Sequence, residues 1–272
     1  MKIFAFLSYD FDDKRFFSYS LMGSSGCGKT TLINSLIGIL KLDGGEVRVF
    51  GEVLKKKMSP RIGFMPQETA LINELNIKEM LWFFGTIFNM PSEKIDSQLH
   101  FLTKLLELPN SKRLIRDCSG GQQRRISFAL TMLHEPELLL LDEPTVGVDP
   151  LLRSMIWNYL TELTRTKGVT VLVSTHYVDE ATQSNQVGFM RNGVRVIEDS
   201  PQRIMEMYDT PNLNEAILKL CSKPDLKIMQ ESFEYISCSP DIQPEQNAEQ
   251  TFRKIIFAVL TKNFLEITRN LG

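Results

Sequence analysis

Residues 16–36 read FFSYSLMGSSGCGKTTLINSL. Its centre fits G-x-x-x-x-G-K-[ST], the spacing of a phosphate-binding loop, with a chance glycine-rich turn as the alternative. Such a loop joins a buried strand to a helix. Residues 16–22 supply the strand, and apolar residues at helical spacing follow the loop until residues 43–45, DGG, end the helix. The predicted loop consists of Gly23, Ser24, Ser25, Gly26, Cys27, Gly28, Lys29 and Thr30, with Thr31 behind it.

The residue types in this loop suit the chemistry of a bound triphosphate. Glycines let successive backbone N–H groups converge on phosphate oxygens, and the following helix adds its positive N-terminal end. The ammonium of Lys29 can reach the β- and γ-phosphates, and the hydroxyl of Thr30 can bind Mg²⁺. The loop therefore predicts a site for a nucleotide with its magnesium ion.

Residues 137–144, ELLLLDEP, place two carboxylates at the end of a continuous apolar run. This run and residues 169–175 are typical of parallel strands buried on both faces. Phosphoryl transfer needs positioning and charge neutralisation, so Asp142 is expected to orient the metal and Glu143 to act on the attacking water. An acidic turn after a strand is the alternative, which the upstream lysine loop disfavours.

Strands and helices alternate along the rest of the chain, and a helical block is inserted at residues 71–135. Hairpins are predicted at residues 46–54, turning near Gly51, and at residues 187–198, with Asn192-Gly193 in the turn. The predicted helix caps are Asn76 with Glu79, Ser92, Ser200 and, at a C-terminus, Gly168. The pattern predicts an α/β core that carries an α subdomain.

Composition places the chain among ordinary globular proteins of one or two domains, with 272 residues, 43% of them hydrophobic and 24% charged. A net charge of -2 disfavours a nucleic-acid partner. The four cysteines lack metal-ligand spacing, which favours a reduced, cytosolic domain. No apolar run reaches the ~18 residues of a membrane span, and the N-terminus is a poor secretory signal.

Residues 118–125, CSGGQQRR, form a third motif. Ser119 is placed to cap a helix whose first N–H groups, near Gly120 and Gly121, lack acceptors inside the helix. Such a helix end can bind an anion. By local physics alone, an ordinary capped helix is the favoured interpretation.

Residues 21–222 resemble the ATP-binding cassette (ABC) ATPases in six ordered motifs. These are the phosphate loop, the Q-loop with Gln67, the signature SGGQQ at residues 119–123, the acidic pair, the D-loop GVDP with Asp149, and the switch histidine His176. Residues 118–130, 141–153 and 174–181 look most like eukaryotic half-transporters of the G and H subfamilies, with the H subfamily closest. The resemblance implies a P-loop NTPase, RecA-like core with a mostly parallel sheet, a small and incomplete antiparallel β subdomain, and the inserted α-helical subdomain.

The resemblance also implies a head-to-tail dimer, homo- or heteromeric, that shares ATP between one phosphate loop and the partner's signature. Ser119, Gly120, Gly121 and Gln122 then face the partner's nucleotide instead of only capping a helix. Gln67 is expected to sense the Mg²⁺ and water, and to link the site to a transmembrane domain through the helical block. His176 is expected to contact the γ-phosphate, although local physics alone suggests a structural histidine. Asp149 is expected to sit across the dimer interface, although local physics alone suggests an Asp-Pro turn.

The tail differs from the rest in composition. Residues 1–222 are expected to form the nucleotide-binding domain, and residues 223–250, rich in Pro, Ser, Gln and Glu, a flexible linker. Residues 251–272 read as a basic amphipathic helix, either packed on its own domain or lying on a membrane surface as the connection to a transmembrane domain. The resemblance favours the membrane role, with the nucleotide domain on the cytoplasmic side.

The sequence before the phosphate loop looks too short for the family's adenine platform, for which Tyr9 and Phe11 are the available stand-ins. A truncated N-terminus is expected, with weak and poorly base-selective nucleotide binding. We therefore expect an Mg²⁺-dependent ATPase domain of a membrane exporter. The alternatives are a catalytically weak or inactive partner module and, less favoured, a soluble non-transport ABC protein that acts on ribosomes or DNA.

Overall fold

The computed structural model describes residues 17–222 except 43, 45, 51 and 54–58. The predictions for Tyr9 and Phe11, for the linker at 223–250 and for the helix at 251–272 lie outside the described residues. Among the helices in the described part of the chain, none combines the length and apolarity needed to cross a bilayer.

The centre of the molecule is a six-stranded sheet in the order β4-β5-β6-β1-β7-β8. All neighbouring strands are parallel except β7 and β8, which form the predicted hairpin. The strands are β1 (Ser18–Gly23), β4 (Ile62–Met65), β5 (Leu138–Asp142), β6 (Thr170–Thr175), β7 (Gln186–Arg191) and β8 (Val194–Asp199). A separate antiparallel pair, β2 (Arg48–Val49) and β3 (Glu52–Val53), forms the other predicted hairpin. The predicted α/β fold with a mostly parallel sheet is confirmed.

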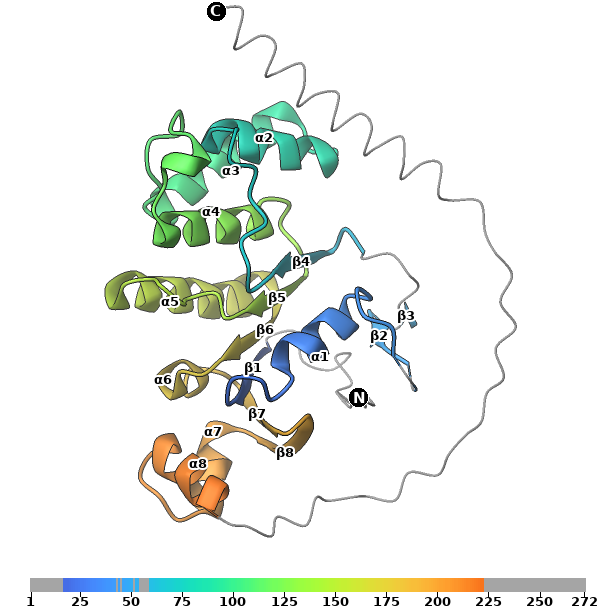
Figure 1. Cartoon of the computed structure of the whole chain (residues 1–272), viewed down its shortest axis with the longest axis vertical. Helices are drawn as coiled ribbons and strands as arrows, with labels where there is room; N and C mark the ends of the chain where they lie inside the picture. Colours follow the sequence, from blue (N-terminus) through green and yellow to red (C-terminus); the bar gives the residue numbers. More distant parts are fainter. Residues whose placement is uncertain (1–16, 43, 45, 51, 54–58, 223–272) are drawn as a thin grey trace, which may run out of the picture.

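Helices cover both faces of the sheet, and successive side chains of the central strands point to opposite faces. In β5, Leu140 packs with the helix α1 (Lys29–Leu36), whereas Leu139 and Leu141 pack with α5 (Pro150–Lys167). The same alternation holds in β6, and it explains why these strands are apolar throughout. Figure 1 shows α1 on one side of the stacked strands, and α5 and α6 (Val178–Ala181) on the other.

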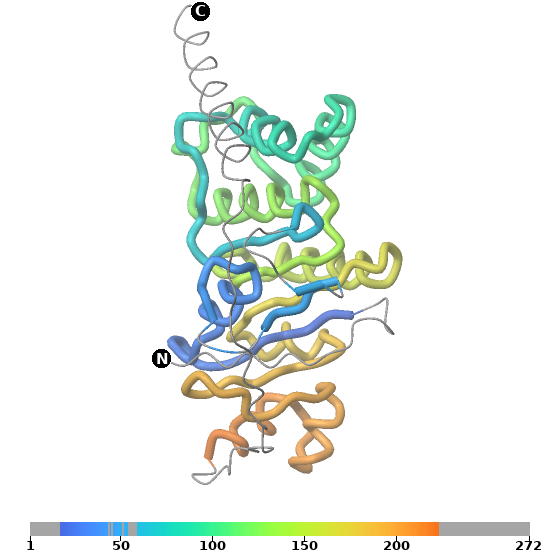
Figure 2. Tube along the Cα trace, turned by 90° about the vertical axis from the view of Figure 1, so that its right-hand side faces the viewer, coloured from blue at the N-terminus to red at the C-terminus, as the bar shows by residue number. Residues whose placement is uncertain are grey.

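The helical block lies beyond the β4 edge of the sheet (Figure 1). It contains α2 (Ile77–Ile87), α3 (Ser92–Leu105), a short 3-10 turn η1 (Ile115–Asp117) and α4 (Gly120–Met132). Figure 2 shows this block at one end of the molecule, with α7 (Pro201–Met207) and α8 (Leu213–Ser222) at the other. These bounds fall inside the stretch 71–135 that the sequence marked as helical; the division into domains stays a prediction.

The helix ends test the capping predictions in detail. Asn76 and Glu79 form the predicted capping box, Ser200 caps α7, and Asn192 and Gly193 both have positive φ in the turn. Two predictions were wrong. Helix α1 ends at Leu36 instead of running to residues 43–45, because Gly38 at φ 79° turns the chain out of the helix. Ser92 is the first helical residue of α3 and not its cap, a position that Pro91 holds in an extended conformation.

Candidate active site

The carboxyl ends of three parallel strands bring the predicted motifs together. Gly23 ends β1, Asp142 ends β5 and Thr175 ends β6. The register pairs Met22 with Thr175 and Asp142 with Ser174, so the residues that follow these strands meet at one edge. This edge is where open α/β sheets bind ligands.

The phosphate loop has the conformation that its glycines permit. Gly26 and Gly28 have φ values of 77° and 106°, in the region that favours glycine. A Cβ on Gly23 would lie 2.5 Å from the Cys27 sulfur and from the carbonyl oxygen of Met190. The Gly193 N–H donates to the Cys27 carbonyl at 2.9 Å, so the β7–β8 turn supports the loop from outside.

Lys29 lies inside this loop with only 5% of its side chain exposed. Its Nζ donates to the carbonyl oxygens of Gly23 at 2.9 Å and Ser24 at 3.3 Å, and lies 3.7 Å from Oε1 of Glu143. Helix α1 starts at Lys29 with no side-chain cap on its N–H groups. An ammonium and a positive helix end therefore face the loop, which suits a phosphate.

The oxygen atoms near the loop fit a small hard cation. Asp142 is 1% exposed; the Ser174 hydroxyl donates to its Oδ1, while its buried Oδ2 has no hydrogen-bond partner among the described residues. The Thr30 hydroxyl donates to Oε1 of Gln67 at 3.3 Å. No group of three His, Cys, Asp or Glu side chains in the described residues makes a metal site. Hydroxyl, amide and carboxylate oxygens are nevertheless the ligands that Mg²⁺ takes beside a phosphate.

Glu143 sits in a strained backbone conformation with φ 51°. Its N–H donates to both the hydroxyl (2.9 Å) and the carbonyl (3.1 Å) oxygens of Ser174, which fixes this conformation. The Oε1 atom lies 3.5 Å from Nδ1 of His176, whose side chain is 45% exposed. The carboxylate is thus held between the Lys29 ammonium and an imidazole, next to the loop where a terminal phosphate fits.

Arg124 is a residue that the sequence reasoning missed. The residue is 5% exposed, and its guanidinium donates to four carbonyl oxygens, those of Pro66 (3.0 Å), Gln67 (2.5 Å), Asp142 (2.6 Å) and Glu143 (2.8 Å). Burial lowers the pKa of Arg124, while the charges of Asp142 and Glu143 oppose that shift. An arginine on the buried side of the signature helix was the available signal. Ser174 was missed too, although a hydroxyl in an otherwise apolar strand is a similar signal.

The signature residues lie apart from the phosphate loop of the same chain. Ser119 caps α4 in a capping box with Gln122: its Oγ accepts from the Gln122 N–H at 3.3 Å, and its own N–H donates to Gln122 Oε1 at 2.9 Å. Ser119 and Gly120 are exposed, and no hydrogen bond in the described part of the chain joins residues 119–122 to residues 23–30. A Cβ on Gly121 would lie 2.8 Å from the Gly147 carbonyl, so α4 begins against the D-loop.

Asp149 has a local role in the single chain. Its Oδ1 accepts from the Leu152 N–H at 3.0 Å and caps α5. The side chain is exposed, as are its neighbours Val146 (39%) and Leu151 (74%). The local interpretation of Asp149 as part of a turn before a helix agrees with this cap. The same segment also exposes apolar side chains next to Asp149.

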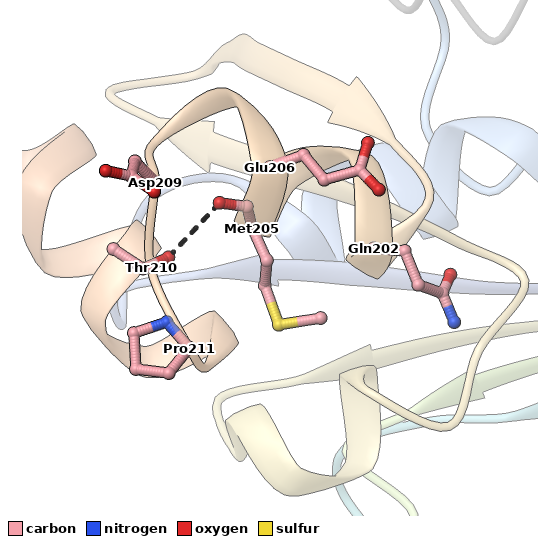
Figure 3. A pocket seen from close by; sticks show the side chains of 6 residues that line it. All are labelled: Gln202, Met205, Glu206, Asp209, Thr210 and Pro211. Atoms are coloured by element: carbon pink, nitrogen blue, oxygen red, sulfur yellow. Dashed lines mark hydrogen bonds between the residues drawn. The ribbon is translucent and has the colours of Figure 1, made fainter.

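A pocket elsewhere on the molecule contains none of these motifs. It lies on α7 and the turn that follows, where the Thr210 hydroxyl donates to the Met205 carbonyl at 3.5 Å (Figure 3). Its lining residues are Gln202, Met205, Glu206, Asp209, Thr210 and Pro211. The strand ends therefore remain the candidate active site.

Comparison with known proteins decides the family. The sequence model of the ABC transporter family matches residues 9–146, which include the phosphate loop, the signature and the acidic pair. The chain belongs to the ABC transporter family. ATP-binding domains of this family are ATPases, and the chain is an ABC-type ATPase domain.

Several relatives are substantially similar to this ABC domain. ABC transporter G family members 23 and 20 of Dictyostelium discoideum are 42% and 39% identical over 207 and 216 residues. The alignments cover 74% and 78% of this chain, and 29% and 30% of those proteins. Nod factor export ATP-binding protein I of Cupriavidus pinatubonensis is 32% identical over 193 residues, or 69% of this chain and 59% of that protein. The chain thus spans under a third of the length of the first two relatives.

Solved structures agree with the fold. A dimeric post-hydrolysis state of the ATP-binding cassette MJ0796, bound to ADP and Pi, is 27% identical with a TM-score of 0.62, over 69% of this chain and 86% of that chain. An ATP-binding subunit of an ABC transporter gives a TM-score of 0.70 at 22% identity, over 76% of this chain and 88% of that chain. The second likeness concerns the fold alone.

Proposed function

We propose that this ABC domain powers a membrane exporter as one half of a head-to-tail dimer, with ATP bound between its phosphate loop and the partner's signature. The main support is the separation of the two motifs within one chain: residues 119–121 form no hydrogen bond with residues 23–30, and Ser119 and Gly120 are exposed. The similar cassette MJ0796 was solved as a dimer, which supports the proposal.

The residues at the strand ends have complementary roles in this proposal. Backbone N–H groups of the phosphate loop and Lys29 bind the β- and γ-phosphates, neutralising charge that grows during transfer. Glu143 accepts a proton from the attacking water, and His176 contacts the γ-phosphate beside it. Ser119 and Gly121 of the partner close the far side of the γ-phosphate. Each group holds one part of an in-line attack, so positioning supplies most of the catalysis.

Thr30, Gln67 and Asp142 would hold Mg²⁺ in this site. The buried Oδ2 of Asp142, which has no hydrogen-bond partner among the described residues, carries this assignment. When bound, Mg²⁺ neutralises phosphate charge and orients the terminal phosphate. Arg124 bonds the carbonyls of both Gln67 and Asp142, and so keeps the two metal-binding segments in register.

The kind of transporter that we propose rests on the relatives and on the residues of the motifs. The named relatives are G-family transporters and Nod factor export proteins, which favours export. We place the chain with G- and H-type half-transporters, the H subfamily closest, and with its nucleotide domain on the cytoplasmic side of a membrane. A transmembrane domain would couple to the site through Gln67 and the helical block. Residues 251–272, from their sequence, would connect to that domain along the membrane surface.

Complementation tests the shared site. Ser119→Arg blocks the signature that the partner's ATP needs, and Lys29→Ala disables the phosphate loop of its own chain. Mixing the two inactive variants places both lesions in one pocket and leaves the other pocket intact, so roughly one working site per mixed dimer should return. Absence of recovery, under conditions where subunit exchange is demonstrated, would count against the shared site.

The wild-type chain tests the alternative of a weak or inactive partner module. That alternative expects ATP binding with little or no turnover by the wild-type chain alone, and substantial turnover only when an active cassette of another type is added. Wild-type turnover that an added cassette does not increase would exclude it.

A further inference from the structure

Glu180 is 2% exposed, and its carboxyl group joins the segment after β5 to the segment after β6. Its Oε1 accepts from the Thr145 hydroxyl at 2.5 Å, and its Oε2 accepts from the Thr175 hydroxyl at 2.6 Å. Thr145 lies two residues after Glu143, and Thr175 directly precedes His176. One buried carboxyl group therefore bonds both segments that carry the proposed water-activating and phosphate-contacting side chains.

Arg153 of α5 adds a third support to the same group. Its Nε lies 3.6 Å from Glu180 Oε1, and its guanidinium carbon lies 4.0 Å from the centroid of the Tyr177 ring. The Tyr177 N–H donates to the Thr175 hydroxyl at 3.0 Å, and its ring centroid lies 4.2 Å from that of His176. Glu180 is thus linked to His176 through Arg153 and Tyr177 as well as through Thr175.

The burial of these groups makes their arrangement specific. Thr145 and Thr175 are each 1% exposed, so a shift of either segment would leave a buried hydroxyl or carboxyl oxygen without its partner, at a cost. His176 is 45% exposed, so the core does not enclose its ring, and the Tyr177 and Glu143 contacts orient it. A rigid support beneath an exposed catalytic side chain is what precise positioning requires.

We propose that Glu180 is a positioning residue for ATP hydrolysis, which holds the turn of Thr175 to Tyr177 against residues 143–148 and thereby keeps His176 beside Glu143. The inference rests on the proposed roles of Glu143 and His176. Glu180 acts only through its neighbours and does not touch the phosphate loop. Its loss should therefore lower kcat and leave KM for ATP nearly unchanged.

Glu180→Gln tests this with Glu198→Gln as a matched control. Glu198 also accepts from a hydroxyl, that of Tyr19 at 2.7 Å, and pairs with a guanidinium, that of Arg195, but it lies on β8. In steady-state ATP hydrolysis, Glu180→Gln should lower kcat at least about 10-fold with KM changed less than about twofold, while Glu198→Gln keeps kcat. A kcat equal to that of the control, in folded protein, would overturn the inference.

Two further readouts separate positioning from a general loss of structure. In the His176→Ala background, Glu180→Gln should lower kcat little further, because the two changes remove one function; full additivity would contradict the inference. If Glu180→Gln does not fold, Thr175→Val should lower kcat while Thr175→Ser, which keeps the hydroxyl, restores it. Equal activity of these two variants would also contradict it.

A readout independent of activity distinguishes failure of this inference from failure of the proposed function. The ring signal of His176 in NMR spectra, assigned by its loss in His176→Ala, should shift in Glu180→Gln and stay in place in Glu198→Gln. An unmoved signal would overturn the inference even in an active enzyme. A wild-type chain that shows no hydrolysis would refute the catalytic roles but not the structural link.

Discussion

The Nζ atom of Lys29 lies 3.7 Å from Oε1 of Glu143 and 2.9 Å from the Gly23 carbonyl oxygen. One ammonium therefore serves both the phosphate loop and the carboxylate after β5. A terminal phosphate competes with Glu143 for this ammonium, because both are anions within its reach. Under the proposed mechanism, a phosphate that draws Lys29 away would leave the Glu143 carboxylate free to accept a proton from water.

Gly23→Ala should weaken ATP binding about 10-fold or more. A Cβ there would lie 2.5 Å from both the Cys27 sulfur and the Met190 carbonyl, so the loop must move off its phosphate-binding conformation. Calorimetric titration with ATP measures the effect. Gly44→Ala is the control, since its Cβ meets no atom within 4 Å. Equal affinity in the two variants would show that the loop tolerates the added methyl group.

Arg124→Met should lower the free energy of unfolding by about 3 kcal/mol or more. The change leaves four carbonyl oxygens without their charged donor, and hydrogen bonds to charged groups are each worth ~1.5–3 kcal/mol, though not additively. Urea unfolding gives the measurement. The neighbouring Arg125→Met is the control: it removes two such bonds, to the Leu106 and Glu107 carbonyls, at a less buried site and should cost less. The reverse order would contradict the account.

Stability should fall below about pH 6.5 because of His134. Burial lowers the pKa of this imidazole below its usual value of 6.5, and its bond to the Ile62 carbonyl only partly opposes the shift. The unfolded chain therefore binds the proton first. Stability is full above the unfolded pKa and declines as the pH falls from there towards the folded pKa, by at most ~1.4 kcal/mol per pH unit.

The variant His134→Phe isolates this effect. Phenylalanine keeps the stacking on Phe88, whose ring centroid lies 3.9 Å from that of His134, but it cannot titrate. Unfolding free energies at pH 7.5 and 5.5 should therefore differ less in the variant than in the wild type. The exposed His100→Gln should retain the wild-type difference. The same pH dependence in wild type and His134→Phe would remove His134 as its source.

The features of the fold and site that were predicted correctly from the sequence depend on residues close together in the chain. The phosphate loop between strand and helix, the apolar runs of β5 and β6, and the capping box of Asn76 with Glu79 each depend on local spacing. The prediction of where α1 ends was wrong because two places in the sequence could stop the helix. The sequence marked residues 43–45 as the stop, but Gly38 already adopts φ 79° at the point where the helix breaks.

The contacts that hold the site together depend on tertiary register and could not be predicted from spacing. The Ser174 hydroxyl meets Asp142 because β5 and β6 pair in one particular register. Arg124 reaches the carbonyls of Gln67 and Glu143 only after the helical block docks on the β4 edge. The partners of Ser174 and Arg124 in these hydrogen bonds lie at no characteristic sequence spacing, so the spacing of motifs does not predict which atoms they contact.

Glu143→Gln is the decisive variant for the proposed activation of the attacking water by Glu143. Amide for carboxylate keeps the shape of the side chain but removes the base, so ATP affinity should stay within a few-fold of wild type. Turnover should fall by ~10²-fold or more. Glu137→Gln, which changes the exposed carboxylate paired with Arg61 just before β5, should leave both values unchanged. Turnover of Glu143→Gln within a few-fold of wild type, in a preparation that hydrolyses ATP, would contradict the account.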